Sequence, residues 1–261
     1  MNAGVDIARR FGGVSRLYGA QGLTKLQAAH ICVIGIGGVG SWAAEALARN
    51  AVGTITLIDL DNIAESNVNR QLHAVEGAFG KAKVTAMAER IKLINPSAEV
   101  IVIEDFVTPE NVNVMLNQPY SGIIDCIDDA KAKAAIASFC QQKGIPLVMT
   151  GAAGGRLDAT LIKQADLSEV SHDKLLAKVR NLLRRDFGFS NGHSAKGKSA
   201  KFGIECIYSD EEIIKPDRIC GVGDNAITGL NCAGYGSSVC VTAPFGFAAA
   251  GLLITRALNH L

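Results

Sequence analysis

The sequence lacks the features that mark secreted or zinc-stapled proteins. It contains no C-x-x-C motif, and its seven cysteines are an odd number in a chain of 261 residues. A disulfide framework and a four-cysteine zinc site are therefore not expected. The first 25 residues carry several charges and no apolar core of the kind found in signal peptides. These features predict a protein of the reducing cytoplasm.

The chain also lacks an excess of either charge. Lys and Arg number 26 against 25 Asp and Glu, so the net charge is +1. This balance argues against a protein that is basic all over, but it leaves room for a local basic patch. With 48% hydrophobic and 20% charged residues, the chain can bury a sizeable core. Its length suits one large domain or two small ones.

Charge is absent altogether from residues 225–255, and the segment 237–258 is mostly apolar. A membrane-spanning helix needs about 20 predominantly apolar residues. This stretch is interrupted by Pro244, Gly246 and Gly251. We expect a strand or loop that leads into a buried helix, and membrane association through 237–258 is the alternative.

The first 150 residues alternate between short apolar runs and helical patterns. Such alternation is typical of right-handed crossovers and a parallel sheet. We therefore predict an α/β fold with a Rossmann-like, doubly wound, mainly parallel sheet. The expected strands are 31–36, 54–60, 100–103, 122–127 and 145–150, and the expected helices are 39–50, 81–94 and 131–143, with a short helix after Thr108-Pro109.

The pattern changes after Gly155. We predict a nucleotide-binding region over 1–155 and a smaller C-terminal α/β extension over 156–261, in the same domain or closely packed. In the extension we expect strands at 159–163 and 202–208, a charged helix at 173–186, loops at 190–201 and 221–236, and a final helix.

Four glycines, Gly35, Gly37, Gly38 and Gly40, lie between the first strand and the first helix. Glycines there let a phosphate approach the backbone, and the helix N-terminus attracts its charge. Asp59 ends the next strand, where an acidic residue binds ribose hydroxyls. The alternative is a tight packing turn. The motif fits a dinucleotide oxidoreductase as well as an ATP enzyme, so other residues must decide.

Polar residues after the second strand favour a triphosphate. Asp61, Asn67 and Arg70 follow that strand, and Lys83 comes at the start of a predicted helix. A guanidinium binds phosphate oxygens in fork geometry, and a lysine there can reach the β- and γ-phosphates. Taken singly, Arg70 fits a surface ion pair and Lys83 a solvated side chain.

Three carboxylates lie at the C-terminal end of the fourth predicted strand. This edge of a parallel sheet faces the ligand crevice, where a carboxylate suits Mg²⁺. We therefore expect the cluster to face the site, with Asp128 as the metal ligand, although a helix cap would explain it equally. The cluster consists of Asp125, Asp128 and Asp129.

The motifs GIGGVGSW, LIDLDNIAESNVNRQLH, GKAK and CIDDAKAK occur in this order. Together they resemble the ThiF/MoeB group, the bacterial relatives of ubiquitin-activating enzymes, over about residues 10–155. The resemblance implies a homodimer that adenylates a carboxylate with ATP and Mg²⁺. It implies that Gly38 contacts phosphates, Asp59 the ribose and Asn67 and Arg70 the triphosphate, while Lys83 orients it and Asp128 holds Mg²⁺.

Two departures from the group's pattern stand out. The two C-x-x-C motifs that bind zinc in ThiF and MoeB are missing. An R-[FY]-x-R motif supplies an arginine finger in those enzymes, but Arg10 and Phe11 are followed here by Gly13, with Arg16 as a shifted substitute. The resemblance therefore gives no firm source for such a finger.

Motifs of the second half, such as RRDFG at 184–188 and CAGYGSS at 232–238, resemble one branch of the group. This branch uses ligase-like adenylation to dehydrate and cyclise N6-threonylcarbamoyladenosine in tRNA. The alternatives are activation of a sulfur-carrier protein's C-terminal glycine, an NAD-linked oxidoreductase with His73 as a candidate, and a non-catalytic scaffold. A sulfurtransferase or cysteine desulfurase partner is conceivable. Cys232 fits a thioester role or an inert thiol.

Positive charge gathers between residues 174 and 201, which hold eight basic side chains and one acidic side chain. The rest of the chain is therefore acidic on balance. A local basic stripe is typical of contact with a phosphate backbone, here the anticodon stem-loop of tRNA. A solvated helix face is the alternative. The basic residues are Lys174, Lys178, Arg180, Arg184, Arg185, Lys196, Lys198 and Lys201.

Overall fold

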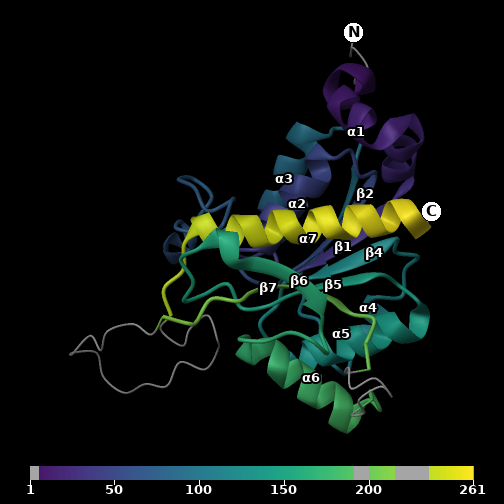
Figure 1. The fold of residues 1–261 in the computed structure, drawn as a ribbon. Helices are drawn as coiled ribbons and strands as arrows, with labels where there is room; N and C mark the ends of the chain where they lie inside the picture. The colour runs from purple at the N-terminus through teal and green to yellow at the C-terminus, as the bar shows by residue number, and fades with distance from the viewer. Residues whose placement is uncertain (1–5, 191–199, 215–234, 261) are drawn as a thin grey trace.

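The computed structural model describes residues 6–190, 200–214 and 235–260, and these form a layered α/β structure around one sheet (Figure 1). The sheet has seven strands in the order β3-β2-β1-β4-β5-β7-β6. All neighbouring strands are parallel except β6 and β7, which are antiparallel. The strands are β1 (His30–Ile34), β2 (Thr54–Ile58), β3 (Glu99–Ile103), β4 (Gly122–Asp125), β5 (Leu147–Thr150), β6 (Ile162–Asp166) and β7 (Glu205–Ser209).

Helices cover both faces of this sheet (Figure 1). One face carries α1 (Ile7–Ala28), α2 (Gly40–Arg49), α3 (Lys83–Ile94) and α7 (Val239–His260). The other carries α4 (Val112–Met115), α5 (Ala130–Lys143) and α6 (Lys174–Asp186). The 3-10 turns are η1 (Glu65–Asn67) and η2 (Ala159–Leu161).

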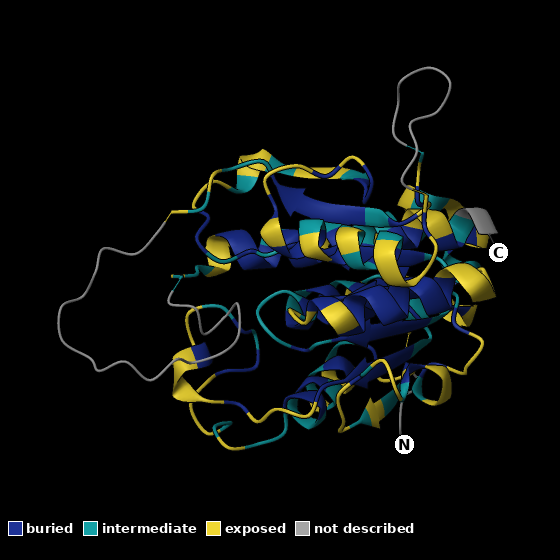
Figure 2. Cartoon of the chain, turned by 90° about the horizontal axis from the view of Figure 1, so that it is seen from below, coloured by how far each residue is buried: buried dark blue, intermediate teal, exposed yellow. Residues whose placement is uncertain are grey.

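The central strands are apolar because both of their faces are covered. In β1 and β2, four of the five residues are fully buried, and all of β4 and β5 is buried. Figure 2 shows the same pattern, with buried strands between helices whose outer faces are exposed. The two hydrophobic clusters, one on each face, confirm the predicted doubly wound α/β fold.

The predicted elements of the first 150 residues are present with slightly different ends, but the sequence analysis missed α1. This helix begins at the capping side chain of Asp6 and is interrupted by non-helical geometry at Phe11 and Gly19. Glycines inside it obscure the helical period. In the extension, a 3-10 turn replaces the start of the strand expected at 159–163, and β6 begins at Ile162.

Strands from both predicted regions share one sheet, because β7 pairs with β5 in parallel and β6 closes the edge. The expected strand at 202–208 is observed at Glu205–Ser209. The expected loops at 190–201 and 221–236 lie mostly outside the described residues.

The apolar C-terminal segment forms α7, which packs on α2 and the sheet. Among the described residues, α7 alone is long and apolar enough to cross a membrane, and half of Val239–Leu258 is buried in the protein. A Cβ at Gly246 would lie 2.5 Å from the carbonyl oxygen of Val39, so the glycine lets the two helices approach closely. Phe245 and Leu253 are completely buried. The packing favours the expected core helix.

Candidate functional site

A cavity of about 840 Å³ opens at the carboxyl ends of the central strands. It lies where the chain leaves the neighbouring strands β1 and β4 for opposite faces of the sheet, and in open α/β sheets this switch point is the usual ligand site. Its walls include the glycine turn, the start of α3, the start of α5 and the start of α6. The cavity thus brings together segments that are far apart in the sequence.

The glycine turn is fixed by close backbone contacts. Gly35 has a φ of +84°, and a Cβ at Gly40 would lie 1.8 Å from the carbonyl oxygen of Gly35. Neither position accepts a side chain without rearrangement. Gly37 and Gly38 line the cavity where α2 begins, so unpaired backbone N–H groups at that helix start face the cavity.

Asp59 joins this turn to the second strand. Its Oδ2 accepts a hydrogen bond from the backbone N–H of Ile36 at 2.6 Å, and its Oδ1 accepts one from Asp61 at 2.9 Å. Burial raises the pKa of the Asp59 carboxyl above its usual value, while the nearby charge of Lys83 opposes the rise. The carboxylate is therefore held rigidly at the cavity wall.

Lys83 is the first residue of α3 and is almost fully buried. Its Nζ lies 2.6 Å from Oδ2 of Asp61, whose side chain is 55% exposed. Both residues line the cavity. Lys83 is thus an anchored cation rather than the solvated side chain of the alternative interpretation.

Asn67 is the last residue of η1, and Arg70 lies three residues after it. The Asn67 side chain is buried, and its Oδ1 accepts from the backbone N–H of Ala64 at 3.1 Å. Arg70 donates to the carbonyl of Ser66 at 2.8 Å and to Oδ1 of Asn69 at 2.9 Å. Among the described residues Arg70 has no carboxylate partner. It therefore does not form the surface ion pair that was the alternative interpretation of this residue.

The backbone of Arg70 is positioned by two helices. Its carbonyl accepts from Nε1 of Trp42 in α2 at 3.0 Å and from Oγ1 of Thr242 in α7 at 3.4 Å. A Cβ at Gly38 would lie 3.2 Å from Cγ of Arg70. The arginine stem therefore lies against the glycine turn.

The expected cluster of three carboxylates does not form. Asp125 is completely buried and its Oδ1 accepts from Nζ of Lys133 at 3.0 Å, so it faces the interior rather than the cavity. Asp129 caps α5 by accepting from the N–H of Ala132 at 2.7 Å. Only Asp128 lines the cavity with an exposed carboxylate that makes no hydrogen bond or ion pair with a described residue.

Two further cavity residues escaped the sequence analysis as individual site residues. Gln71 is buried, and its Oε1 has no hydrogen-bond partner among the described residues. Its place directly after Arg70 in the polar motif was the available signal. Cys126 also lines the cavity, but burial raises the pKa of its thiol to about 12, so it stays protonated at neutral pH.

The basic segment is less uniform than its charge count suggested. Arg180 donates to the carbonyls of Val170 and Leu167, and Arg184 stacks over the ring of Phe202 at 5.4 Å. Arg185 pairs with Asp186 at 2.6 Å. Lys174, Lys178 and Lys201 are exposed. Lys196, Lys198 and Cys232 lie outside the described residues.

Arg10, Phe11 and His73 are further candidates from the sequence, and none of them lines this cavity. Arg10 donates to the carbonyl of Ile94 at 2.7 Å, and Phe11 is buried. His73 is buried with both ring nitrogens unpartnered among the described residues, and burial lowers its pKa to about 4. It does not line the cavity, so nothing here assigns it to hydride transfer.

The doubly wound sheet, the glycine turn and the cation-lined cavity define a nucleotide-binding α/β protein. The chain belongs to the ThiF family, whose model matches residues 11–256. This match confirms the resemblance that the sequence motifs indicated.

Similar proteins extend over nearly the whole chain. The tRNA threonylcarbamoyladenosine dehydratase of Haemophilus influenzae is 46% identical over 96% of this chain and 94% of its own length. The enzyme of the same name from Escherichia coli K12 is 47% identical over 92% of this chain and 90% of its own length. The crystal structure of the E. coli dehydratase TcdA in complex with ATP matches with a TM-score of 0.85 at 44% identity, covering 97% of this chain and 95% of that one.

Proposed function

We propose that the chain is an ATP-dependent enzyme that dehydrates N6-threonylcarbamoyladenosine in tRNA. The observation that carries the proposal is the near-complete coverage, at 46–47% identity, by relatives with that activity. The cavity supports it independently, because cations and a free carboxylate surround a glycine turn suited to a triphosphate.

In this proposal ATP binds across the glycine turn. Backbone N–H groups around Gly38 bind the phosphates, and the carboxylate of Asp59 binds the ribose hydroxyls. Asn67 and Arg70 hold the triphosphate, while Lys83, anchored by Asp61, presents a fixed positive charge to it. All of these residues line the cavity.

Asp128 would hold Mg²⁺. Its carboxylate faces the cavity with no partner among the described residues, and those residues contain no group of three or more His, Cys, Asp or Glu side chains that could hold a metal. Such a donor set fits Mg²⁺, which commonly binds one or two carboxylates together with substrate phosphates. When bound, the ion would neutralise charge on the phosphates.

The chemistry activates a poor electrophile. An oxygen of the substrate's threonyl carboxylate attacks the α-phosphorus of ATP, the bond to the β-phosphate breaks, and pyrophosphate leaves. Arg70 and Lys83 stabilise the charge that develops on the phosphates. The neighbouring carbamoyl group then attacks the acyl carbon, loses a proton, and expels AMP with the carboxylate oxygen. Because this attack is intramolecular, it needs little further protein chemistry.

Further features complete the proposal. The enzyme acts as a homodimer and works in the cytoplasm. Helix α7 is a core helix rather than a membrane anchor, because half of Val239–Leu258 is buried in the protein. Residues 1–155 bind the nucleotide, and 156–261 complete the sheet and contact tRNA. A sulfurtransferase or cysteine desulfurase system is the candidate partner to be tested by co-purification. Size determination in solution and cell fractionation test the first two of these features.

The function is tested by AMP release that depends on modified tRNA. We expect AMP only when ATP, Mg²⁺ and tRNA carrying threonylcarbamoyladenosine are all present. Asp128→Asn should lower kcat at least about 100-fold, as expected for lost electrostatic stabilisation. Glu89→Gln, which removes an exposed carboxylate of α3 paired with Lys81, is the matched control and should keep full activity. AMP release driven equally well by unmodified tRNA would contradict the proposal.

A further inference from the structure

The cavity has a second wall that the proposed ATP site does not use. It is formed by the starts of α5 and α6, from which Lys131 and Lys174 line the cavity. Both side chains are exposed, and neither makes a hydrogen bond or ion pair with a residue that the structure describes. They therefore differ from Lys83, which is buried and paired with Asp61.

Acidic side chains also line this region, so the two lysines do not make a purely basic surface. Glu110 lies within the electrostatic reach of Lys131, and the pKa of Glu110 is lowered mainly by its hydrogen bond with Thr108 and to a smaller extent by that lysine. Asp128 is three residues before Lys131. The lysines thus line the same cavity as the free carboxylate of Asp128.

The backbone under Lys174 is held firmly. Asp173 caps α6 by accepting from the N–H of Leu176 at 2.9 Å, and its other oxygen accepts from the N–H of Ala152 at 2.8 Å. A Cβ at Gly151 would lie 2.2 Å from that oxygen. The cap therefore ties the start of α6 to the loop that follows β5, and both line the cavity.

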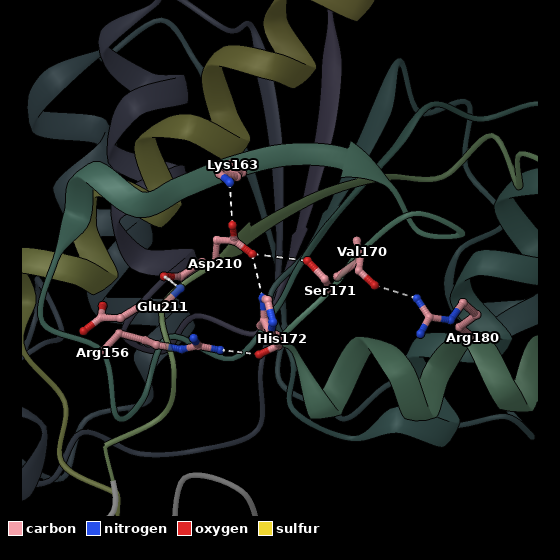
Figure 3. Close-up of polar contacts among 9 residues, drawn as sticks. Arg156, Lys163, Val170, Ser171, His172, Arg180, Asp210 and Glu211 are labelled. Atoms are coloured by element: carbon pink, nitrogen blue, oxygen red, sulfur yellow. Dashed lines mark hydrogen bonds and ion pairs between the residues drawn. The ribbon is translucent and has the colours of Figure 1, made fainter. Parts of the chain in front are cut away.

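The residues before this cap are fixed from two sides (Figure 3). The carboxylate of Asp210 binds Nζ of Lys163 at 2.5 Å, Nδ1 of His172 at 2.7 Å and Oγ of Ser171 at 3.2 Å. The buried guanidinium of Arg156 donates to the carbonyl of His172 at 2.9 Å. This support holds His172 in left-handed geometry, with a φ of +53°, two residues before Lys174.

We infer that Lys131 and Lys174 bind the RNA phosphates next to the modified adenosine and so position the nucleoside over the ATP site. Two exposed ammonium groups that line one cavity from the starts of α5 and α6 suit a phosphodiester, because lysine contacts phosphate as a point charge without fixed geometry. Lys178, exposed one turn further along α6, extends the positive charge away from the cavity. This inference rests on the proposed function and names the part of tRNA that the second wall recognises.

The test compares binding of two anticodon stem-loop RNAs, one carrying the threonylcarbamoyl group and one without it. Fluorescence anisotropy across a range of salt concentrations gives the affinity and its salt slope. The variants are Lys131→Gln, Lys174→Gln and the double variant. Lys143→Gln is the matched control, because Lys143 is an exposed lysine at the opposite end of α5. ATP affinity reports whether each variant keeps its fold and nucleotide site.

We expect the double variant to bind both RNAs at least about tenfold more weakly at low salt, with a salt slope reduced by about 0.7 to 0.9 for each lysine removed. The ATP affinity of all variants should stay unchanged, and Lys143→Gln should bind both RNAs as the unaltered protein does. Unaltered affinity and slope would overturn the inference. A loss confined to the modified RNA would also overturn it, because the lysines would then contact the threonyl carboxylate. Dehydration by the unaltered enzyme is measured first, so failure of the proposed function is distinguished from failure of this inference.

Discussion

Single residues in this site divide into charges that are paired within the fold and charges that face the cavity. Asp125 is paired with Lys133 in the interior, and Asp61 anchors Lys83. Asp128 has no partner among the described residues. A charge inside a protein costs less free energy when it is paired, so the free carboxylate stands out as the one available to a cation.

The buried pair can be tested through stability. Lys133→Met should lower the free energy of unfolding by about 3–5 kcal/mol, because it leaves Asp125 buried without its partner. Urea denaturation measures the change. The double variant Asp125→Leu/Lys133→Met should recover most of the loss, since it removes both charges. Equal losses in the single and double variants would contradict this role of the pair.

Buried His73 predicts a loss of stability in acid. Burial lowers its pKa to about 4, below the ordinary value of 6.5. The unfolded chain therefore binds a proton between these two values while the folded chain does not, so stability falls as pH decreases through this window. Between pH 7 and pH 5 this group should cost about 2 kcal/mol. In His73→Phe the midpoint of urea unfolding should fall less between pH 7 and pH 5. An unchanged fall would show that His73 is not the group responsible.

Residue identity could be predicted from the sequence more readily than side-chain direction. Asp59 follows from its place at the end of a strand after a glycine turn, and it lines the cavity as that motif implies. Asp125 has an equally suitable place in the sequence, yet it turns inward, because Lys133 in the first turn of α5 reaches back to it. Such a pairing between a strand and the helix that follows it has no signature in the local sequence.

At the scale of elements, α7 connects the hydrophobic core with the site. It packs on α2 through Gly246, and its first turn contacts the segment that carries Arg70, since the N–H of Val239 donates to the carbonyl of Asn69 at 3.0 Å. Asn69 in turn donates to the carbonyl of Ser237 at 2.7 Å. The helix and the residues just before it therefore position the segment that carries Arg70, although they lie about 170 residues further along the chain.

Gly246→Val should damage both stability and the nucleotide site. The added side chain would meet the backbone of Val39 and Ala43 at the start of α2, and overpacking of this kind costs about 1–3 kcal/mol. ATP affinity should fall because the glycine turn adjoins that start. Calorimetry measures both effects.

Gly251→Ala is the matched control, because a Cβ there has nothing within 4 Å. It should leave ATP affinity unchanged and raise stability by about 0.5–1 kcal/mol, as expected for alanine in a helix interior. Similar effects of the two variants would contradict the close contact of α7 with α2.

The strands of the nucleotide-binding half could be predicted because they are buried on both faces and read as continuous apolar runs. Two other elements were predicted less well. β6 was expected at 159–163 but is observed at Ile162–Asp166, because only one of its five residues is buried and its apolar signal is weak. Helix α1 contains glycines with non-helical geometry, so its sequence lacks a clean helical period.

At the scale of the whole molecule, one sheet joins the nucleotide site to the C-terminal extension that we propose contacts tRNA. The start of α6 and the loop after β5 meet the glycine turn around a single cavity. This arrangement predicts that ATP binding stabilises the entire chain. At 100 times its Kd, ATP should add about 2.7 kcal/mol to the free energy of unfolding, while NAD should add nothing. Thermal unfolding with each nucleotide measures this, and stabilisation by NAD alone would favour an oxidoreductase.

The central claim is that this cavity turns the threonyl carboxylate of the tRNA nucleoside into an acyl adenylate that cyclises. Mass spectrometry of nucleosides from tRNA incubated with the protein, ATP and Mg²⁺ tests it most directly. The account predicts that the threonylcarbamoyl nucleoside loses the mass of one water with ATP, but not without ATP and not with Asp128→Asn. A nucleoside of unchanged mass after incubation with folded, ATP-binding protein would contradict it.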